Sequence, residues 1–397
     1  MSKTDGRTNG NPGQMILPSL VISRFATMPP GFLTGLLLID IGDSFGQTVG
    51  VTGQIRTAAS IVGVISALLI SALTLRFKPK SLLVGGLVIL VASTVGCALA
   101  PSFSVLLVVY ALTGMAGSLV GPMAFTLIAE HFPSDQRANA ISWVITGMSA
   151  ANLIGAPIIG YISGFVGWRG SFLWFALPIS LFGLFLAVKF IPSGQRSGPG
   201  EQRGGQGIIE GFKGVLMDTS AVSCLAGTAF IAAAYMAMAS YAPSYYREQF
   251  SISTAQATLV IIGSSVFFIL GTRICGSLVS RYGRKPMMLW PSALAALSIF
   301  VYLNVSNIWL SLAARFLGST FSAVVFTAAN ALTLEQVPSY RGTVMSLSQA
   351  MFSLGGVLGS GLGGLVVLLL GYEAMGVSHG AMMLVAMLIL HFFAKEP

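Results

Sequence analysis

The sequence predicts an all-α integral membrane protein with twelve transmembrane helices in two six-helix repeats and both termini in the cytoplasm. Three observations predict this fold: the composition, the long apolar runs, and a set of landmarks that recurs at one offset. Of the 397 residues, 54% are hydrophobic and only 8% are charged. A soluble globular protein carries about 25% charged residues, so most of this chain is expected to lie in lipid.

The apolar runs are long enough to cross a membrane, because a hydrocarbon core about 30 Å thick needs roughly 20 helical residues. They do not alternate polar and apolar residues at every second position, which excludes transmembrane β-strands and leaves helices. Twelve such runs are predicted, near residues 17–39, 52–75, 81–100, 104–129, 138–163, 170–191, 219–243, 255–279, 287–304, 308–334, 343–370 and 374–393.

Two polar segments divide the chain. Residues 1–16 predict a cytoplasmic N-terminal tail, and the Gly-rich stretch within residues 192–218 predicts a cytoplasmic linker. The linker separates an N-terminal six-helix bundle, residues 17–191, from a C-terminal six-helix bundle, residues 219–394. The 3 cysteines all fall inside apolar runs, so we expect neither disulfides nor a metal site, and no cofactor is predicted.

The distribution of positive charge predicts the orientation. Sixteen of the 21 Lys and Arg residues, Arg24 among them, fall in or beside the predicted cytoplasmic segments, whereas Arg56, Arg169 and Arg247 fall outside or at the outer rim. Cytoplasmic loops of membrane proteins are enriched in Lys and Arg. The partition therefore places both termini inside, and it explains the net charge of +9 without a nucleic-acid partner.

A shift of 205 residues superimposes landmarks of the two halves. It aligns Arg76 with Arg281, Lys80 with Lys285, and Glu130 with Glu335. The same offset aligns the basic loops of the two halves and also the helix ends that follow them. This agreement indicates a duplicated six-span unit.

These features resemble the major facilitator superfamily over residues 16–394. The resemblance rests on the two repeats, on the Gly/Pro-rich fifth span, and on a loop signature seen here as Gly276, Ser280, Arg281, Tyr282, Gly283, Arg284 and Lys285. Ser280 replaces the acidic residue of the signature. The resemblance implies that this loop latches the cytoplasmic side, and the alternative is that its cations only set the topology.

The residues expected in this latch are basic loop residues and the acids or glycines beside them. They are Arg76, Lys80, Glu130, Arg137, Gly276, Arg281, Gly283, Arg284, Lys285, Glu335 and Arg341. In the fifth span, Gly147, Gly155, Pro157 and Gly160 form a partial match to the antiporter motif of the family. Small residues at helical spacing permit close helix packing, and proline permits a bend.

The resemblance also implies a substrate site near the midplane, between the two halves. Methionine and aromatic side chains suit apolar ligands, and a few polar groups orient them. The alternative for each such side chain is that it contacts lipid or a neighbouring helix instead of substrate. The candidates are Thr34, Met115, Asn152, Tyr235, Phe267, Arg273, Arg315, Phe326 and Gln349.

Two of these candidates carry charge. A cation in the membrane interior costs about 2.5–3.5 kcal/mol, so Arg273 and Arg315 are expected to face a cavity, a partner or the headgroups. No acidic residue is expected at the midplane. The candidate proton carriers are therefore Asp40, Asp43 and Glu130, near the membrane surfaces.

Three hypotheses follow. The first is a secondary transporter that moves a small amphipathic or lipophilic solute by alternating access, in the manner of drug efflux with proton antiport. The second is an organic-anion or monocarboxylate transporter that uses Arg273 and Arg315. The third, a membrane-embedded enzyme or receptor, has no supporting catalytic motif. We expect a multi-pass protein of the cytoplasmic (inner) membrane, which acts as a monomer on a small molecule, with lipid and protons as the other partners.

Overall fold

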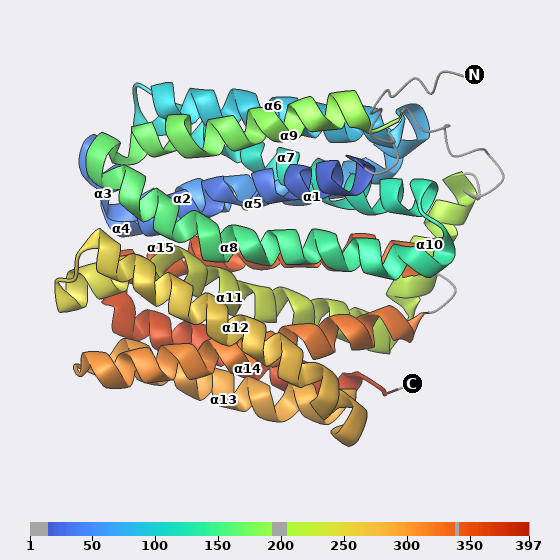
Figure 1. The fold of residues 1–397 in the computed structure, drawn as a ribbon. Coiled ribbons are helices and arrows are strands. Elements are labelled where there is room, and N and C mark those ends of the chain that lie inside the picture. Colours follow the sequence, from blue (N-terminus) through green and yellow to red (C-terminus); the bar gives the residue numbers. More distant parts are fainter. Residues whose placement is uncertain (1–14, 193–204, 338–340, 397) are drawn as a thin grey trace, which may run out of the picture.

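The computed structural model describes residues 15–192, 205–337 and 341–396, and helices make up nearly all of this part of the chain. The helices lie roughly side by side along one direction (Figure 1). The N-terminal half contains α1 (Ile16–Ala26), α2 (Pro29–Leu36), α3 (Leu38–Phe45), α4 (Val49–Thr52), α5 (Gln54–Arg76), α6 (Pro79–Leu99), α7 (Phe103–His131), α8 (Ser134–Ser171), the π-helical segment η2 (Phe172–Ala176) and α9 (Leu177–Phe190).

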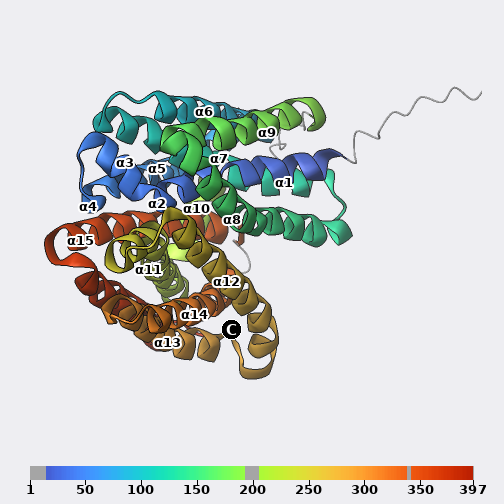
Figure 2. The ribbon, with the colours of Figure 1, turned by 60° about the vertical axis from the view of Figure 1, so that its left-hand side comes forward.

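The C-terminal half follows a short helix, α10 (Gly205–Met217), at the end of the predicted linker. It contains α11 (Thr219–Phe250), α12 (Thr254–Tyr282), α13 (Arg284–Asn304), α14 (Ile308–Gln336) and α15 (Arg341–Phe393). Turning the molecule by 60° keeps the blue-to-green helices above the yellow-to-red ones, so the two halves are separate layers (Figure 2).

Ten helices in the described part of the chain are long and apolar enough to cross a membrane. Two of them, Leu153–Phe190 with 38 residues and Ser346–Phe393 with 48, are about twice the length that one crossing needs. Each contains a glycine with non-helical backbone angles: Gly167 has φ 66° and Gly371 has φ 81°. Division at these glycines would give the predicted twelve spans, and that number stays a prediction.

The first span is not the continuous helix predicted over residues 17–39. It is interrupted between α1 and α2, and again at Leu37, before α3. The first interruption has a chemical cause, because Pro29 and Pro30 occupy the start of α2 and cannot donate the backbone hydrogen bonds that would continue α1.

The two ends of the bundle differ. The start of α1, helix α10 and the C-terminus lie at one end, named here the terminal end, and α3 and α4 lie at the opposite end, named the loop end (Figure 1). The charge distribution predicts that the terminal end faces the cytoplasm. At this end the repeat is visible in atomic contacts: Lys80 donates to the Val188 carbonyl oxygen at 3.0 Å, and Lys285 donates to that of Ala394 at 2.7 Å.

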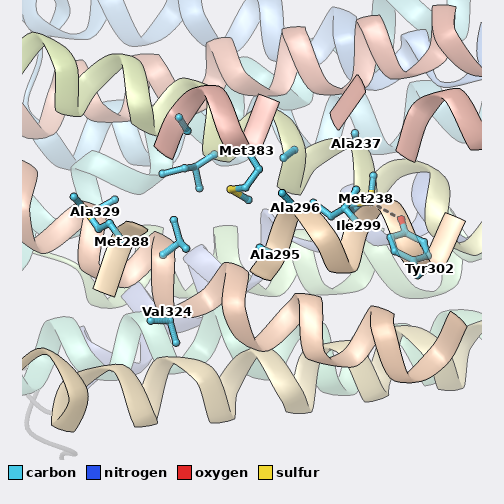
Figure 3. Close-up of a cluster of buried hydrophobic side chains, with 14 of the residues drawn as sticks. Ala237, Met238, Met288, Ala295, Ala296, Ile299, Tyr302, Val324, Ala329 and Met383 are labelled. Atoms are coloured by element: carbon cyan, nitrogen blue, oxygen red, sulfur yellow. Dashed lines mark hydrogen bonds between the residues drawn. The ribbon is translucent and has the colours of Figure 1, made fainter. Parts of the chain in front are cut away.

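The core of the C-terminal half is built from small residues and a few large ones. Figure 3 shows Met288, Ile299 and Met383 among alanines, with Tyr302 beside Met238. The Tyr302 hydroxyl donates to the Met238 sulfur. This packing fixes the wall of the cavity described below.

The halves are joined near the loop end. Gln54 of α5 donates to the Gly361 carbonyl oxygen of α15 at 3.2 Å. Arg247, in the last turn of α11, forms an ion pair with Asp40 of α3. Both contacts cross from one half to the other, so they hold the loop end closed in this structure.

Candidate functional site

Arg315 lies inside the C-terminal bundle, on α14. Its guanidinium carbon lies 5.5 Å from the centre of the Tyr302 ring, and its Nε is buried without a hydrogen-bond partner. Beside it is a cavity of about 20 Å³, which has room for one water molecule. The cavity is lined by Tyr235, Met238, Ile299, Tyr302, Arg315, Gly318, Ser319 and Ser322. The Tyr302 ring packs against the Arg315 guanidinium, and the Nε–H of Arg315 remains available to a ligand.

Arg56 lies between the two halves. Its Nη1 donates to the carbonyl oxygen of Gly31 in α2 and to that of Ala239 in α11, both at 3.2 Å. Gly35 leaves the room for this approach, because a Cβ there would lie 2.9 Å from the Ala239 oxygen and 3.0 Å from Arg56 Nη1. A single guanidinium therefore bridges the halves through two backbone carbonyls.

Tyr235 lies beside Arg315, and both residues line the cavity. Its ring packs against that of Phe268, with 5.4 Å between the ring centres. The arrangement places the Arg315 cation beside an aromatic surface, inside a predominantly apolar bundle.

Arg24 is a third cation within a span. It lies in α1, where its Nε contacts the Met148 sulfur at 3.3 Å and its Nη1 contacts Thr27 Oγ1 at 3.5 Å. Neither partner is charged. In the described part of the chain the ion pairs are Arg247–Asp40 and Arg284–Glu335, so Arg24, Arg56 and Arg315 have no carboxylate partner there.

Arg24 and Arg56 are the residues that sequence reasoning missed. The partition of charges assigned Arg24 to the cytoplasmic side and Arg56 to the outside. The candidate spans Ile16–Leu36 and Val49–Ile70 contain both residues, as the predicted runs 17–39 and 52–75 already did, and the structure shows their contacts with neighbouring helices. The available signal was that both interrupt an apolar run, since a cation kept in a span at an energetic cost is a candidate for function.

The other predicted substrate residues lie in several places. Thr34 is buried and shares a hydrogen bond of 3.0 Å with Tyr110. Phe267 stacks on Phe316 at 5.1 Å, and Phe326 packs edge-on to Phe352 at 5.7 Å. Met115 and Gln349 are half-buried, Arg273 is exposed on α12, and the Asn152 side chain lies outside the described residues. Among the predicted residues whose side chains are described, Tyr235 and Arg315 lie together at the cavity.

Two of the predicted latch residues of the C-terminal half, Arg284 and Glu335, contact each other at the terminal end. Arg284 pairs with Glu335 at the end of α14, and its backbone N–H donates to Glu396 at 2.6 Å. Arg281 stacks on Tyr282. These contacts stay within one half. Arg76 and Glu130 are exposed, and the surroundings of Arg137, Gly276 and Arg341 lie outside what the structure describes.

The glycines of the fifth span lie at helix contacts. A Cβ on Gly147 would lie 2.7 Å from Val21 Cγ1, and one on Gly160 would lie against Thr258 of α12 in the other half. Gly155 has ordinary space around it, with its nearest neighbours at 3.7 Å, and Pro157 lies inside α8.

The acids considered for proton coupling lie away from the central cations. Asp40 pairs with Arg247, and Glu130 is exposed. Asp43 lines a loop-end pocket of about 490 Å³, together with Gln47, Glu248 and Tyr372. No group of three or more His, Cys, Asp or Glu residues suited to a metal ion occurs in residues 15–192, 205–337 and 341–396.

Comparison with known proteins decides the family. The model of the Major Facilitator Superfamily matches residues 20–253 and 223–397. The chain belongs to this superfamily. It is therefore a multi-pass membrane transporter for a small molecule and not an enzyme.

Relatives and solved structures agree with the superfamily fold. The chain is 25% identical over 385 residues to the uncharacterized MFS-type transporter YwfA of Bacillus subtilis, covering 95% of this chain and 92% of that protein. It is also 25% identical over 377 residues to the transcription regulatory protein OpdE of Pseudomonas aeruginosa, covering 93% and 90%.

Among solved structures, a D-xylose-proton symporter superimposes with a TM-score of 0.80 at 17% identity, covering 97% of this chain and 98% of that one. The nucleoside transporter NupG gives a TM-score of 0.79 at 13% identity, covering 96% and 100%. At these identities the likeness shows the superfamily fold alone.

Proposed function

We propose that this superfamily member is a secondary transporter for a small organic anion with an apolar body. The observation that carries the proposal is Arg315, which lines a cavity with Tyr235 and has a buried Nε without a hydrogen-bond partner; neither it nor Arg56, which lies between the halves, has a carboxylate partner among the described residues. A charge inside the membrane costs about 2.5–3.5 kcal/mol, and an anionic substrate is the partner that would offset this cost.

The neighbouring residues favour an amphipathic anion. A guanidinium recognises a carboxylate by two parallel N–H bonds, and Arg315 has its Nε free for such a bond. The rings of Tyr235 and Phe268 offer an apolar surface next to it. The substrate would place one carboxylate oxygen in the cavity beside Arg315, which has room for one water molecule, and its apolar body on the rings.

Arg56 supplies a link between binding and alternating access. Its two carbonyl partners, Gly31 and Ala239, belong to different halves. An anion that pairs with Arg56 competes for the same N–H groups and weakens this bridge. Substrate would thereby bias the equilibrium between the states open at either end, as differential binding requires.

Export of uncharged amphipathic or lipophilic solutes is the second candidate. The aromatic pairs Phe267–Phe316 and Phe326–Phe352 favour it, because such surfaces accept varied apolar ligands. Proton antiport through Asp40, Asp43 or Glu130 belongs to this candidate.

A ligand panel separates the two candidates. It contains carboxylates with aromatic or alkyl bodies, each matched with its uncharged primary amide, and it is screened by thermal shift on the purified protein. Under the anion proposal at least one carboxylate raises the melting temperature and its amide does not. Stabilisation by the amides to the same extent would overturn the anion proposal in favour of the second candidate.

Variants then locate the site. Arg315→Gln and Arg56→Gln should each weaken carboxylate binding about ten- to hundred-fold, because a hydrogen bond to a charged group is worth about 1.5–3 kcal/mol. Arg273→Gln is the matched comparison, because Arg273 is an exposed arginine of a span. Transport into liposomes of the carboxylate that stabilises the wild type most should be reduced in Arg315→Gln and Arg56→Gln and not in Arg273→Gln. Loss of binding in Arg273→Gln alone would move the site to α12.

A further inference from the structure

Arg24 has the geometry of a second binding residue. It lies in α1, whereas Gly31 and Gly35 lie in α2, but Thr27 and Met28 at the interruption keep right-handed helical angles. Seven and eleven residues separate the two glycines from Arg24, about two and three helical turns, so the three residues lie toward one side of the first span despite the bend. That side faces the other half, because Gly35 approaches Ala239 and Gly31 accepts a hydrogen bond from Arg56. By helical rise, Arg24 lies roughly 10 Å nearer the terminal end than Gly31.

The partners of Arg24 leave its charge unbalanced. A guanidinium has five N–H donors. In this structure one donates to a thioether sulfur, that of Met148 at 3.3 Å, and another reaches Thr27 Oγ1 at 3.5 Å. Both are weak acceptors, or acceptors at the limit of hydrogen-bond distance. Strong acceptors, which a carboxylate would supply, are absent from these contacts.

The space for this cation is created by a missing side chain. A Cβ on Gly121 of α7 would lie 3.0 Å from Arg24 Nη1, 3.1 Å from Cζ and 3.4 Å from Nη2. The guanidinium therefore lies flat against the backbone of α7, between α1, α7 and α8. One turn earlier, a Cβ on Gly117 would have no neighbouring atom within 4 Å. Of these two glycines, only Gly121 accommodates Arg24.

We propose that Arg24 forms a second organic-anion subsite, on the path between the central site at Arg56 and Arg315 and the terminal end. This inference rests on the proposed function and extends it. The substrate carboxylate exchanges between two arginine sites, which shortens the part of the path over which its charge has no partner.

The test uses the carboxylate of the panel that stabilises the wild type most. Arg24→Gln removes the charge, and Gly121→Ala displaces the guanidinium while the charge remains. Both should raise the KM for transport of this carboxylate about tenfold or more. Gly117→Ala, the control on the same helix, should leave the KM unchanged. Melting temperatures without ligand show whether each variant folds.

A second measurement distinguishes a subsite from a residue that only supports the central site. In a variant that carries both Arg56→Gln and Arg315→Gln, carboxylate-dependent stabilisation should fall but remain measurable, because Arg24 still binds. Addition of Arg24→Gln to this variant should abolish the remaining stabilisation. If Arg24→Gln and Gly121→Ala behave as wild type while Arg315→Gln loses binding, the second subsite is refuted and the proposed function stands. If no carboxylate stabilises the wild type above its amide, the proposed function itself fails.

Discussion

Arg247 of α11 and Asp40 of α3 form a bidentate ion pair across the two halves, with Nη1–Oδ2 at 2.5 Å and Nη2–Oδ1 at 3.2 Å. Arg247 Nη1 also reaches the Leu36 carbonyl oxygen at 3.5 Å. The side chains are 15% and 38% exposed, so water only partly screens the pair. It lies at the end where the halves are closed, and its rupture is required for that end to open.

Arg247→Gln should shift the transporter toward the state open at the loop end. A partly exposed pair is worth at most about 1 kcal/mol, which corresponds to a change of about fivefold in the ratio of the two states. The measurement is the rate at which an impermeant thiol reagent labels a cysteine at Gln47, a residue of the loop-end pocket. The charge swap Asp40→Arg with Arg247→Asp should restore the slow rate. Equal rates in wild type and Arg247→Gln would exclude a gating role.

Gly50→Ala should prevent complete closure of the loop end. In this structure a Cβ on Gly50 would run into the Gly364 carbonyl oxygen of α15 and lie 2.9 Å from Leu368 Cβ. Overpacking of this kind costs about 1–3 kcal/mol, and the open state avoids it. Spin labels at Thr48 and Leu369 would report a longer mean distance between the halves.

The control for this variant is Gly85→Ala in α6, where a Cβ would have no neighbour within 4 Å. It should leave the distance distribution unchanged. A distribution in Gly50→Ala that matches the wild type would show that α4 and α15 do not limit closure.

Gly283→Ala should lower the melting temperature of the protein. Gly283 connects α12 and α13 with φ 85° and ψ 168°, a conformation that only glycine adopts readily. A side chain there costs about 1–3 kcal/mol and would also lie 2.9 Å from Glu396 Oε1. Thermal unfolding in detergent measures the effect, again with Gly85→Ala as the neutral reference. An unchanged melting temperature would contradict a strained turn at this position.

The two basic turns should react from the same side of the membrane. Cysteines introduced at Lys78 and Arg281 lie at the terminal end, and one at Glu248 lies at the loop end. An impermeant reagent added outside intact cells should label only the Glu248 site, because the positive charge predicts a cytoplasmic terminal end. Labelling of Lys78 and Arg281 from opposite sides would refute the two-repeat fold.

Much of the fold was predictable because membrane insertion depends on local properties. A run of about 20 apolar residues spans the bilayer whatever its neighbours are, so the long helices follow from composition and length. The offset of 205 residues aligned Lys80 with Lys285, and the structure gives these two lysines equivalent carbonyl partners. The breaks were less predictable: the first span turns before Pro29, where a single helix was expected.

The candidate site was predictable only in part. Arg315 was identified, because a cation inside an apolar run is conspicuous. Arg56 was assigned to the outer rim, since counting charges by loop treats a residue near a span end as part of that loop. Its partners, Gly31 and Ala239, are separated from it by 25 and 183 residues, and nothing in the local sequence indicates either contact.

The sequence by itself determined that this protein is inserted in a membrane, that it consists of two related halves, and that its spans contain few charged residues. These properties depend on the free energy of transferring each segment from water to hydrocarbon. This free energy is a sum of contributions from the residues of that segment. Only the tertiary structure decided what each cation contacts. Helix rotation and packing bring Arg56 to Gly31 and Ala239 and place Arg315 beside Tyr235, and electrostatic interactions depend on such distances.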